Sequence, residues 1–170
     1  MPERVIRAGR VEDDAWAFFG LGADADLNAA IADGPWAVPL AVWKARRGEL
    51  RARRDAIGIW LQPADDVAEL APDLDAVALV AIQFPKFSEG RGYSAAALLR
   101  GRYHYRGELR AFGDIGRDNL FYLSRVGFDA FTLRPGTDLE AALAGLRDFS
   151  VRYQAANDEP RPLFRRRLPE

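Results

Sequence analysis

A chain of 170 residues that is 49% hydrophobic is long enough to form one domain with its own apolar core. Its formal net charge of −1 argues against a general nucleic-acid binder, which needs excess cations to neutralise phosphates. The absence of cysteine excludes disulfides, thiol redox chemistry and cysteine-ligated iron–sulfur clusters. His104 is the only histidine, so neither a His-rich metal site nor a Ser-His-Asp triad is expected.

No segment suggests insertion into a membrane. The longest apolar runs fall well short of the roughly 18 residues of a spanning helix, and the N-terminus lacks the apolar region of a signal peptide. We therefore expect no membrane contact and a cytoplasmic location.

The first third of the sequence predicts an appendage to the core. Residues 4–16 have short apolar segments on both sides of an Ala-Gly-Arg turn, a pattern typical of a β-hairpin. Residues 18–35 are rich in Gly, Ala and Asp and indicate a surface loop. Residues 36–56 predict a helix with Pro39 in its first turn. We assign residues 1–56 to an N-terminal arm and helix that pack on the core.

Residues 57–150 alternate regularly between strand and helix patterns, and form the predicted core. Asp65 and Asp66 are expected in turns and caps at the start of the first helix. Thr137 and Glu140 are expected to form a capping box at the start of the last helix. The predicted strands are 57–61, 77–84, 109–112 and 130–133, and the later helices are 94–103, 117–126 and 138–149.

Four successive βα units predict an α/β fold with a parallel sheet, because right-handed crossovers return each strand parallel to the one before it. Two architectures remain open, a partial TIM-barrel-like sheet and an open, doubly wound, flavodoxin-like sheet. The partial barrel is our first choice. It would leave strand edges bare, and these favour a homodimer or a cover made by the N-terminal segment.

Charged residues follow the predicted strands. Ligands of parallel sheets bind at the carboxyl ends of the strands, so these residues predict a pocket for a small anion or phosphorylated metabolite. Within it, Lys86 and Asp114 are the candidate catalytic acid and base. The candidate anion-binding residues are Lys86, Arg91, Gly92, Ser94 and Arg134.

Two of these residues have structural alternatives. Arg91 could pair with Glu89 and fix its loop, and Asp114 could cap the following helix at Arg117. The glycines at 90 and 92 are too closely spaced for a dinucleotide-binding or P-loop motif, so no dinucleotide is expected, and no metal site is predicted.

The C-terminal tail, 151–170, contains the sequence PRPLFRRRLPE. One interpretation is a disordered end. The other is a docking peptide within 157–170, with Leu163 and Phe164 as apolar anchors and the arginines steering it to a partner.

The stretches FPKFSEGRGYSAAALLRGR and GELRAFGDIGRDNLFYLSRVGFDAF resemble the bacterial domain-of-unknown-function 934 family, whose members are labelled oxidoreductases of sulfite reduction. The resemblance is densest over 84–131. The chain departs from the family pattern at Glu89, Asn119 and Gly116, where Asp, Gln and a larger residue are usual. The matching positions are Phe84, Lys86, Phe87, Gly90, Arg91, Gly92, Ser94, Arg100, Glu108, Arg110, Gly113, Asp114, Asp118, Arg125, Gly127 and Asp129.

The resemblance implies an accessory protein of assimilatory sulfite reduction that contacts sulfite reductase, or another sulfate-assimilation protein, through the 157–170 tail. The cofactor is unknown, and a flavin bound without a recognisable motif remains open. Two alternatives stand beside this. One is a stand-alone enzyme acting on a small anionic metabolite. The other is a purely structural motif in which ion pairs of Glu108 and Arg110 fix the sheet.

Overall fold

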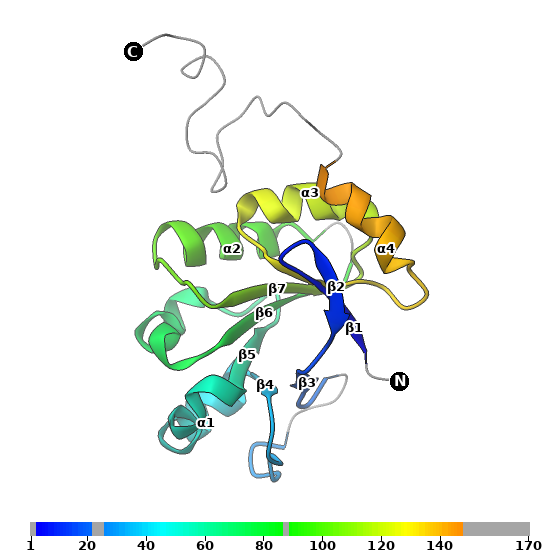
Figure 1. The fold of residues 1–170 in the computed structure, drawn as a ribbon. Helices are drawn as coiled ribbons and strands as arrows, with labels where there is room; N and C mark the ends of the chain where they lie inside the picture. The colour runs from blue at the N-terminus through cyan, green and yellow to red at the C-terminus, as the bar shows by residue number, and fades with distance from the viewer. Residues whose placement is uncertain (1–2, 22–25, 87–88, 148–170) are drawn as a thin grey trace.

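The computed structural model describes residues 3–21, 26–86 and 89–147, with the backbone alone at Arg147. It shows a mixed α/β fold built on a curled eight-stranded sheet (Figure 1). The strand order is β2-β1-β8-β7-β6-β5-β4-β3, in which β3 to β8 are parallel and β1 and β2 are antiparallel.

The N-terminal hairpin is confirmed. It consists of β1 (Arg4–Arg7) and β2 (Arg10–Asp13). Ala8 and Gly9 both have left-handed backbone angles, φ 49° and 75°, which match a two-residue hairpin turn. β1 pairs antiparallel with β8 (Ala130–Thr132), so the hairpin covers the edge that the parallel strands would leave bare.

The predicted loop is present over residues 19–21 and 26–35, which contain no helix or strand, but the segments on either side of it differ from the prediction. β3 (Ala17–Phe18) and β4 (Trp36–Pro39) are parallel strands that extend the sheet beyond β5. Pro39 is the N-cap of α1 (Leu40–Leu50) rather than a residue of its first turn, and a 3-10 segment, Arg51–Ala56, follows. The apolar residues of β4 read as part of the helix pattern because a four-residue buried strand has no distinctive period.

The predicted strands of the core are present as β5 (Ile57–Leu61), β6 (Leu79–Phe84), β7 (Glu108–Gly113) and β8. The crossover after β5 contains two 3-10 segments, Val67–Glu69 and Ala71–Ala76, instead of a helix, because Pro72 interrupts it. Asp66 caps the first of them, as its place in a turn suggests.

The helices after β6, β7 and β8 cover one face of the sheet. They are α2 (Arg91–Gly101), α3 (Arg117–Val126) and α4 (Leu139–Ala142), the last continued by a 3-10 segment, Leu143–Arg147. The expected capping box of the last helix is wrong in its register, since Asp138 is the N-cap and accepts a hydrogen bond from Ala141 N–H at 3.1 Å. An Asp directly before the helix is the better placed acceptor.

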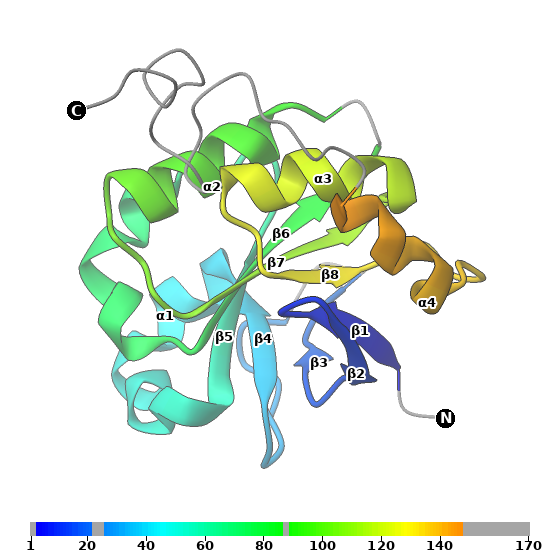
Figure 2. The same ribbon diagram turned by 45° about the horizontal axis from the view of Figure 1, so that its top comes forward.

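The two faces of the sheet are covered differently (Figures 1 and 2). The outer face packs against all four helices in one large apolar core that includes Trp43, Leu99 and Leu120. The inner face holds a smaller apolar cluster, in which Trp60 and Phe112 pack against Trp16 and Phe18 of the N-terminal segment. Segment 14–19, which includes β3, therefore follows the hairpin and crosses the hollow, inner side of the sheet.

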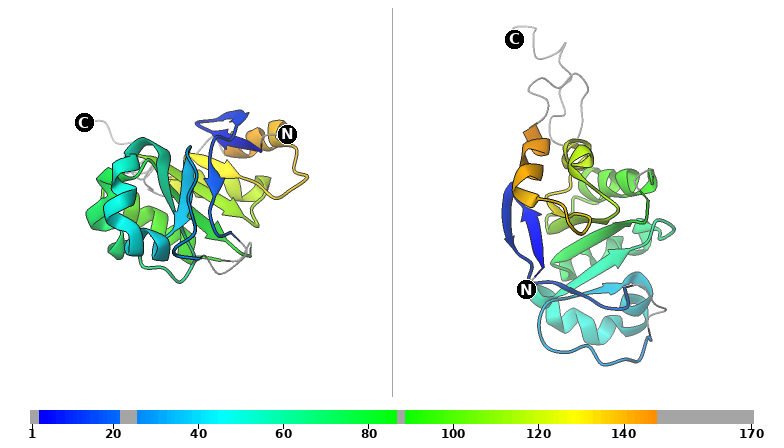
Figure 3. Two further views of the ribbon diagram at one scale, coloured as in Figure 1. Left: turned by 90° about the horizontal axis from the view of Figure 1, so that it is seen from below. Right: turned by 90° about the vertical axis from the view of Figure 1, so that its right-hand side faces the viewer.

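The strand order differs from that of the doubly wound alternative. From β3 to β8 the strands lie in chain order, without the reversal that defines a doubly wound sheet. The hairpin and β3 lie at opposite ends of this order, and Figure 3 shows how the sheet curls between them. The sequence predicts that the N-terminal segment packs on the core. Its described residues, 3–21 and 26–56, also contribute four strands to the sheet.

Candidate functional site

Four charged or polar residues lie at the carboxyl ends of β5 to β8. Gln62, Lys86, Asp114 and Arg134 each follow one of these strands by one or two residues. Because the strands are parallel, all four residues lie at the same end of the sheet. The described side chains nevertheless fall into two groups, one beside β5 and β6 and the other beside β7 and β8.

The group beside β7 and β8 is centred on Arg134. Its guanidinium Nη1 lies 3.3 Å from Asp114 Oδ1, and the two side chains are 53% and 38% exposed. A Cβ atom added at Gly116, the N-cap of α3, would lie 2.7 Å from Arg134 Nη2, so the guanidinium lies against the start of that helix. The first N–H groups of a helix carry partial positive charge, so two positive features meet here.

A cavity of about 340 Å³ opens at this point, lined by Gly116, Arg117, Asp118, Arg134 and Thr137. It is the part of the strand-end surface where a guanidinium, a hydroxyl and a helix N-terminus come together. A small oxyanion is the chemical class that such donors suit.

The N-cap position of α3 is held by Gly116 and not by Asp114. The Asn119 side chain takes part in the cap, since its Oδ1 accepts a hydrogen bond from the Gly116 N–H at 2.9 Å. In a capping box, the side chain of the third helical residue accepts a hydrogen bond from the N-cap N–H, and a Gln at this position can do the same as Asn119. Asp114 forms an ion pair with Arg134, which lines the cavity.

The group beside β5 and β6 contains Arg91, Gly92 and Ser94, which line a separate cavity of about 310 Å³ together with Gln62. A Cβ at Gly92 would lie 2.5 Å from the Phe84 ring, so this glycine admits the ring. The five predicted anion-binding residues therefore do not form one pocket. Arg134 lines the other cavity, because β7 separates β6 from β8, and Lys86 lines neither of the two.

Arg91 is neutralised by a neighbour. Its Nε and Nη2 lie 2.9 and 3.1 Å from the two carboxylate oxygens of Glu89, which also accepts the Arg91 backbone N–H. These hydrogen bonds from Arg91 lower the pKa of Glu89 below its ordinary value. Lys86 is exposed, and within the described residues its ammonium has no hydrogen-bond or ion-pair partner.

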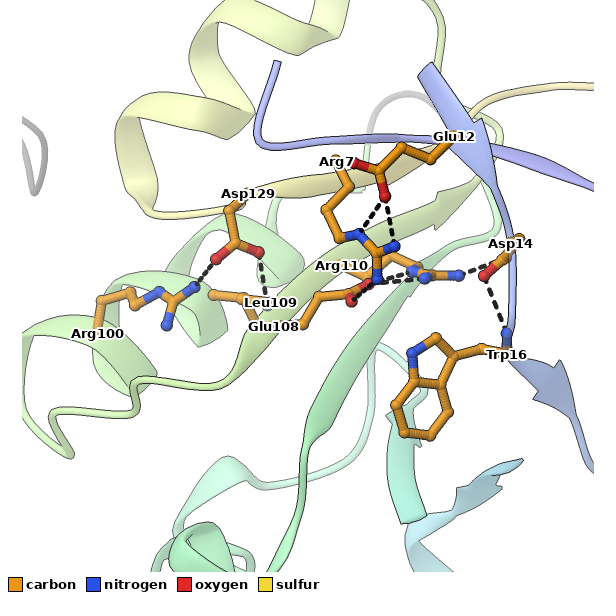
Figure 4. Close-up of polar contacts among 9 residues, drawn as sticks. All are labelled: Arg7, Glu12, Asp14, Trp16, Arg100, Glu108, Leu109, Arg110 and Asp129. Atoms are coloured by element: carbon orange, nitrogen blue, oxygen red, sulfur yellow. Dashed lines mark hydrogen bonds and ion pairs between the residues drawn. The ribbon is translucent and has the colours of Figure 1, made fainter. Parts of the chain in front are cut away.

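Several charged residues of the motif build the fold. Arg100 donates four hydrogen bonds, to the carbonyls of Gly127, Tyr105 and Gly107 and to Asp129 Oδ2 at 2.7 Å. The other oxygen of Asp129 accepts the Leu109 N–H at 2.8 Å (Figure 4). Burial raises the pKa of Asp129. This cluster ties α2 to the beginning of β7 and the turn before β8.

A second cluster lies on the inner face of the sheet (Figure 4). The Arg110 side chain is fully buried, with Nε 2.8 Å from Glu108 Oε1 and Nη1 2.6 Å from Asp14 Oδ2. Arg7 bridges Glu108 and Glu12 from the hairpin. Asp14 also accepts the Trp16 N–H, but its main partner, Arg110, lies 96 residues away, and no local pattern could reveal it.

The remaining motif residues also have structural surroundings. The Phe84 ring packs on those of Tyr93 and Phe128, with centroids 5.6 and 5.9 Å apart. Gly113 has φ 109° and Gly90 is the N-cap of α2. Asp118 lies in the first turn of α3, where the helix dipole favours a carboxylate, and the Arg125 guanidinium lies over the Phe121 ring. Phe87 and the docking tail, 157–170, lie outside the described residues.

Two kinds of feature are absent from the described part of the chain. It holds no group of three or more His, Asp or Glu side chains arranged to bind a metal ion. None of its helices combines the length and apolarity needed to span a bilayer.

Comparison with known proteins places the chain in a family. A family model described as "Bacterial protein of unknown function (DUF934)" matches residues 58–164, which is more than half of the chain. The chain belongs to the DUF934 family. A comparison with curated proteins finds no match.

The DUF934 match begins within β5, although four strands of the same sheet precede β5 in the chain. β1 to β4 and α1 precede it and still supply the hairpin edge, the inner-face cover and the partner of Arg110. Some residues within the DUF934 match therefore make contacts that hold the sheet together. They are Glu108, Arg110 and Asp129.

Proposed function

We propose that this DUF934 protein is an accessory protein of assimilatory sulfite reduction that holds a small oxyanion at the carboxyl ends of β7 and β8. The family resemblance suggests the pathway. The observation that carries the binding proposal is the position of Arg134 against the N-terminus of α3, beside a cavity, with a half-exposed carboxylate as its charge partner. Oxyanions bind at such helix starts.

A finer architectural inference supports the location. We interpret the curled sheet as a partial TIM-barrel-like sheet, because its parallel strands are in chain order and its helices pack on the outer face. Ligands of such sheets bind at the carboxyl ends of the strands, where Arg134 lies.

The donors at the cavity suggest which oxyanion is preferred. Arg134 offers a planar fork of N–H groups, and Thr137 offers a hydroxyl. Asp118, which lines the cavity, and Asp114, which pairs with Arg134, are carboxylates that can accept a hydrogen bond from a protonated oxygen but repel an oxygen without a proton. Sulfite is partly protonated near neutral pH and sulfate is not, so the arrangement favours sulfite over sulfate.

The protein's part in the pathway would be to bind or deliver the anion rather than to hold electrons. The sequence contains no cysteine, so it offers no thiolate for an iron–sulfur cluster. The proposed partner is sulfite reductase, contacted through the tail 157–170. Full-length protein and a version ending at Asn157 should differ in recovery of sulfite reductase from cells grown on sulfate.

Two measurements test the proposal. A deletion strain should grow slowly on sulfate and normally on a reduced sulfur source, and normal growth on sulfate would make the pathway role wrong. In calorimetry, Arg134→Ala should weaken sulfite binding about tenfold or more, since a charge-assisted contact contributes roughly 1.5–3 kcal/mol. Arg4→Ala is the matched control, because Arg4 is also ion-paired and is 51% exposed.

Gly116→Ala probes the same site without removing a charge. The added methyl group would displace the Arg134 guanidinium, the flexible end of a side chain, so the fold should tolerate it. Weaker sulfite binding at unchanged melting temperature is expected. Unchanged binding in both variants would place the anion elsewhere.

The exposed Lys86 favours a second candidate, a stand-alone enzyme acting on a small anionic or phosphorylated metabolite. Its ammonium has no partner within the described residues, whereas Arg91 is neutralised by Glu89. Lys86 or Asp114 would act as acid or base. Arg91 would act as the anion clamp by exchanging its exposed pairing with Glu89 for the substrate. Lys86→Ala and Asp114→Asn should then abolish turnover without unfolding the protein, and full activity in both would exclude this candidate.

A further inference from the structure

A larger cavity, of about 720 Å³, opens at the opposite end of the sheet, where β5, β6 and β7 begin. Its floor includes the buried side chains of Leu74, Val77 and Tyr105. Charged and titratable residues line its rim, namely Arg54, Asp55, Asp75, His104 and Arg106. An apolar floor with a few polar groups above it, in a volume of roughly 300–1,000 Å³, is the usual form of a small-molecule site.

The two arginines of this cavity differ from most other arginines in the part of the chain that the structure describes. Among described side chains, Arg10, Arg54 and Arg106 make no ion pair, hydrogen bond or ring contact with another described residue. Two of these three line this one cavity. Arg53, the residue next to Arg54, does have partners, because it donates hydrogen bonds to the carbonyls of Ala32 and Gly34. The absence of a described partner therefore distinguishes Arg54 from its neighbour in the chain.

His104 adds a backbone feature. It has φ 55°, in the left-handed region that side chains other than glycine rarely adopt. The next residue holds it there, because Tyr105 is buried and its carbonyl accepts Arg100 Nη1 at 2.7 Å while its hydroxyl donates to the Val77 carbonyl at 3.3 Å. Backbone strain of this kind is often found at ligand sites.

We propose that this cavity binds a phosphorylated small molecule of the size of a nucleoside monophosphate. Arg54 and Arg106 would hold the phosphate, for which the guanidinium fork is well suited. Asp55 also has no partner within the described residues and would accept hydrogen bonds from the hydroxyls of the ligand. The apolar floor would take the ring of the base. This site is separate from the oxyanion site and does not depend on it.

Calorimetry with full-length protein tests the ligand class. AMP, GMP, CMP and UMP are titrated singly, beside adenosine and inorganic phosphate. At least one nucleotide should bind at least about tenfold more tightly than phosphate or adenosine alone, because the rim and the floor are both used. Failure of all four nucleotides to bind, or equal affinity for phosphate alone, would overturn the proposal.

Variants locate the site. Arg54→Ala and Arg106→Ala should each weaken nucleotide binding about tenfold or more, whereas Arg10→Ala, the third unpaired arginine, should leave it unchanged. His104→Gly relieves the left-handed backbone, so it should keep or raise the melting temperature while it weakens binding. Equal losses in the Arg10 and Arg54 variants would show nonspecific charge attraction and refute the site.

Discussion

Asp14→Ala should be among the most destabilising single substitutions in this protein. It removes a carboxylate that is 2% exposed. The fully buried Arg110 guanidinium then keeps Glu108 as its one charged partner among the described residues. Removing one member of a buried pair costs about 3–5 kcal/mol. Glu108 already serves Arg7 as well, so it compensates only in part, and we expect a loss of about 3 kcal/mol in the free energy of unfolding.

Urea denaturation followed by tryptophan fluorescence measures this loss. Trp16 lies two residues from Asp14 and packs on the inner face, so its emission reports whether segment 14–19 stays in place. The cycle is completed by Arg110→Met and the double variant. Because the residues are in contact, the coupling energy should be about 2 kcal/mol or more, with the double variant more stable than the sum of the single losses predicts.

Asp13→Ala is the matched control for this cycle. Asp13 is the adjacent carboxylate, it is exposed, and it has no ion-pair partner within the described residues. Its loss should stay within about 0.5 kcal/mol. A coupling energy near zero between positions 14 and 110, or equal effects of the two aspartate variants, would refute the reasoning that the buried pair anchors the N-terminal segment.

Further predictions concern backbone, charge and pH. Gly136→Ala should lower the free energy of unfolding by roughly 1 kcal/mol, because Gly136 has a positive φ. Gly113→Ala should lower it by more, because Gly113 also has a positive φ and its added methyl group would lie 2.4 Å from a carbonyl oxygen. Chemical denaturation measures both losses. Asp73→Ala should cost about 3 kcal/mol in the same assay, because this buried carboxylate binds the Trp43 indole and two arginines. Arg91→Ala should raise the pKa of Glu89 toward 4.5 in an NMR titration. The pair's stabilisation is present above that value and is lost as pH falls through the lowered folded-state pKa. No change in that pKa would show that Arg91 does not hold Glu89 in solution.

The family motif and the candidate chemistry overlap only in part. Arg100, Arg110 and Asp129 are engaged with carbonyls, buried carboxylates or backbone N–H groups. Substitution at these positions should therefore lower stability first, and a loss of activity there would not identify a catalytic residue. Arg134 and Lys86 are exposed at the strand ends, so they give the cleaner test of function.

Local patterns were sufficient where a residue's role depends on near neighbours. The strands at 57–61 and 109–112 and the helix at 117–126 are present, because an apolar run or a helical period is a property of adjacent residues. The hairpin around Ala8 and Gly9 follows from the same kind of signal. The Arg91–Glu89 alternative could also be foreseen, since the two residues are two positions apart.

The sequence by itself thus determined an α/β fold with a parallel sheet, the hairpin and the strand ends at which charged residues collect. Only the tertiary structure decided that Trp36–Pro39 is a strand, that Asp14 is the partner of Arg110, and that the predicted anion site is divided between two cavities. The physical reason is that strand pairing, burial of a charge and the meeting of loops depend on residues far apart in the chain, and composition and period carry no record of which distant residues come together.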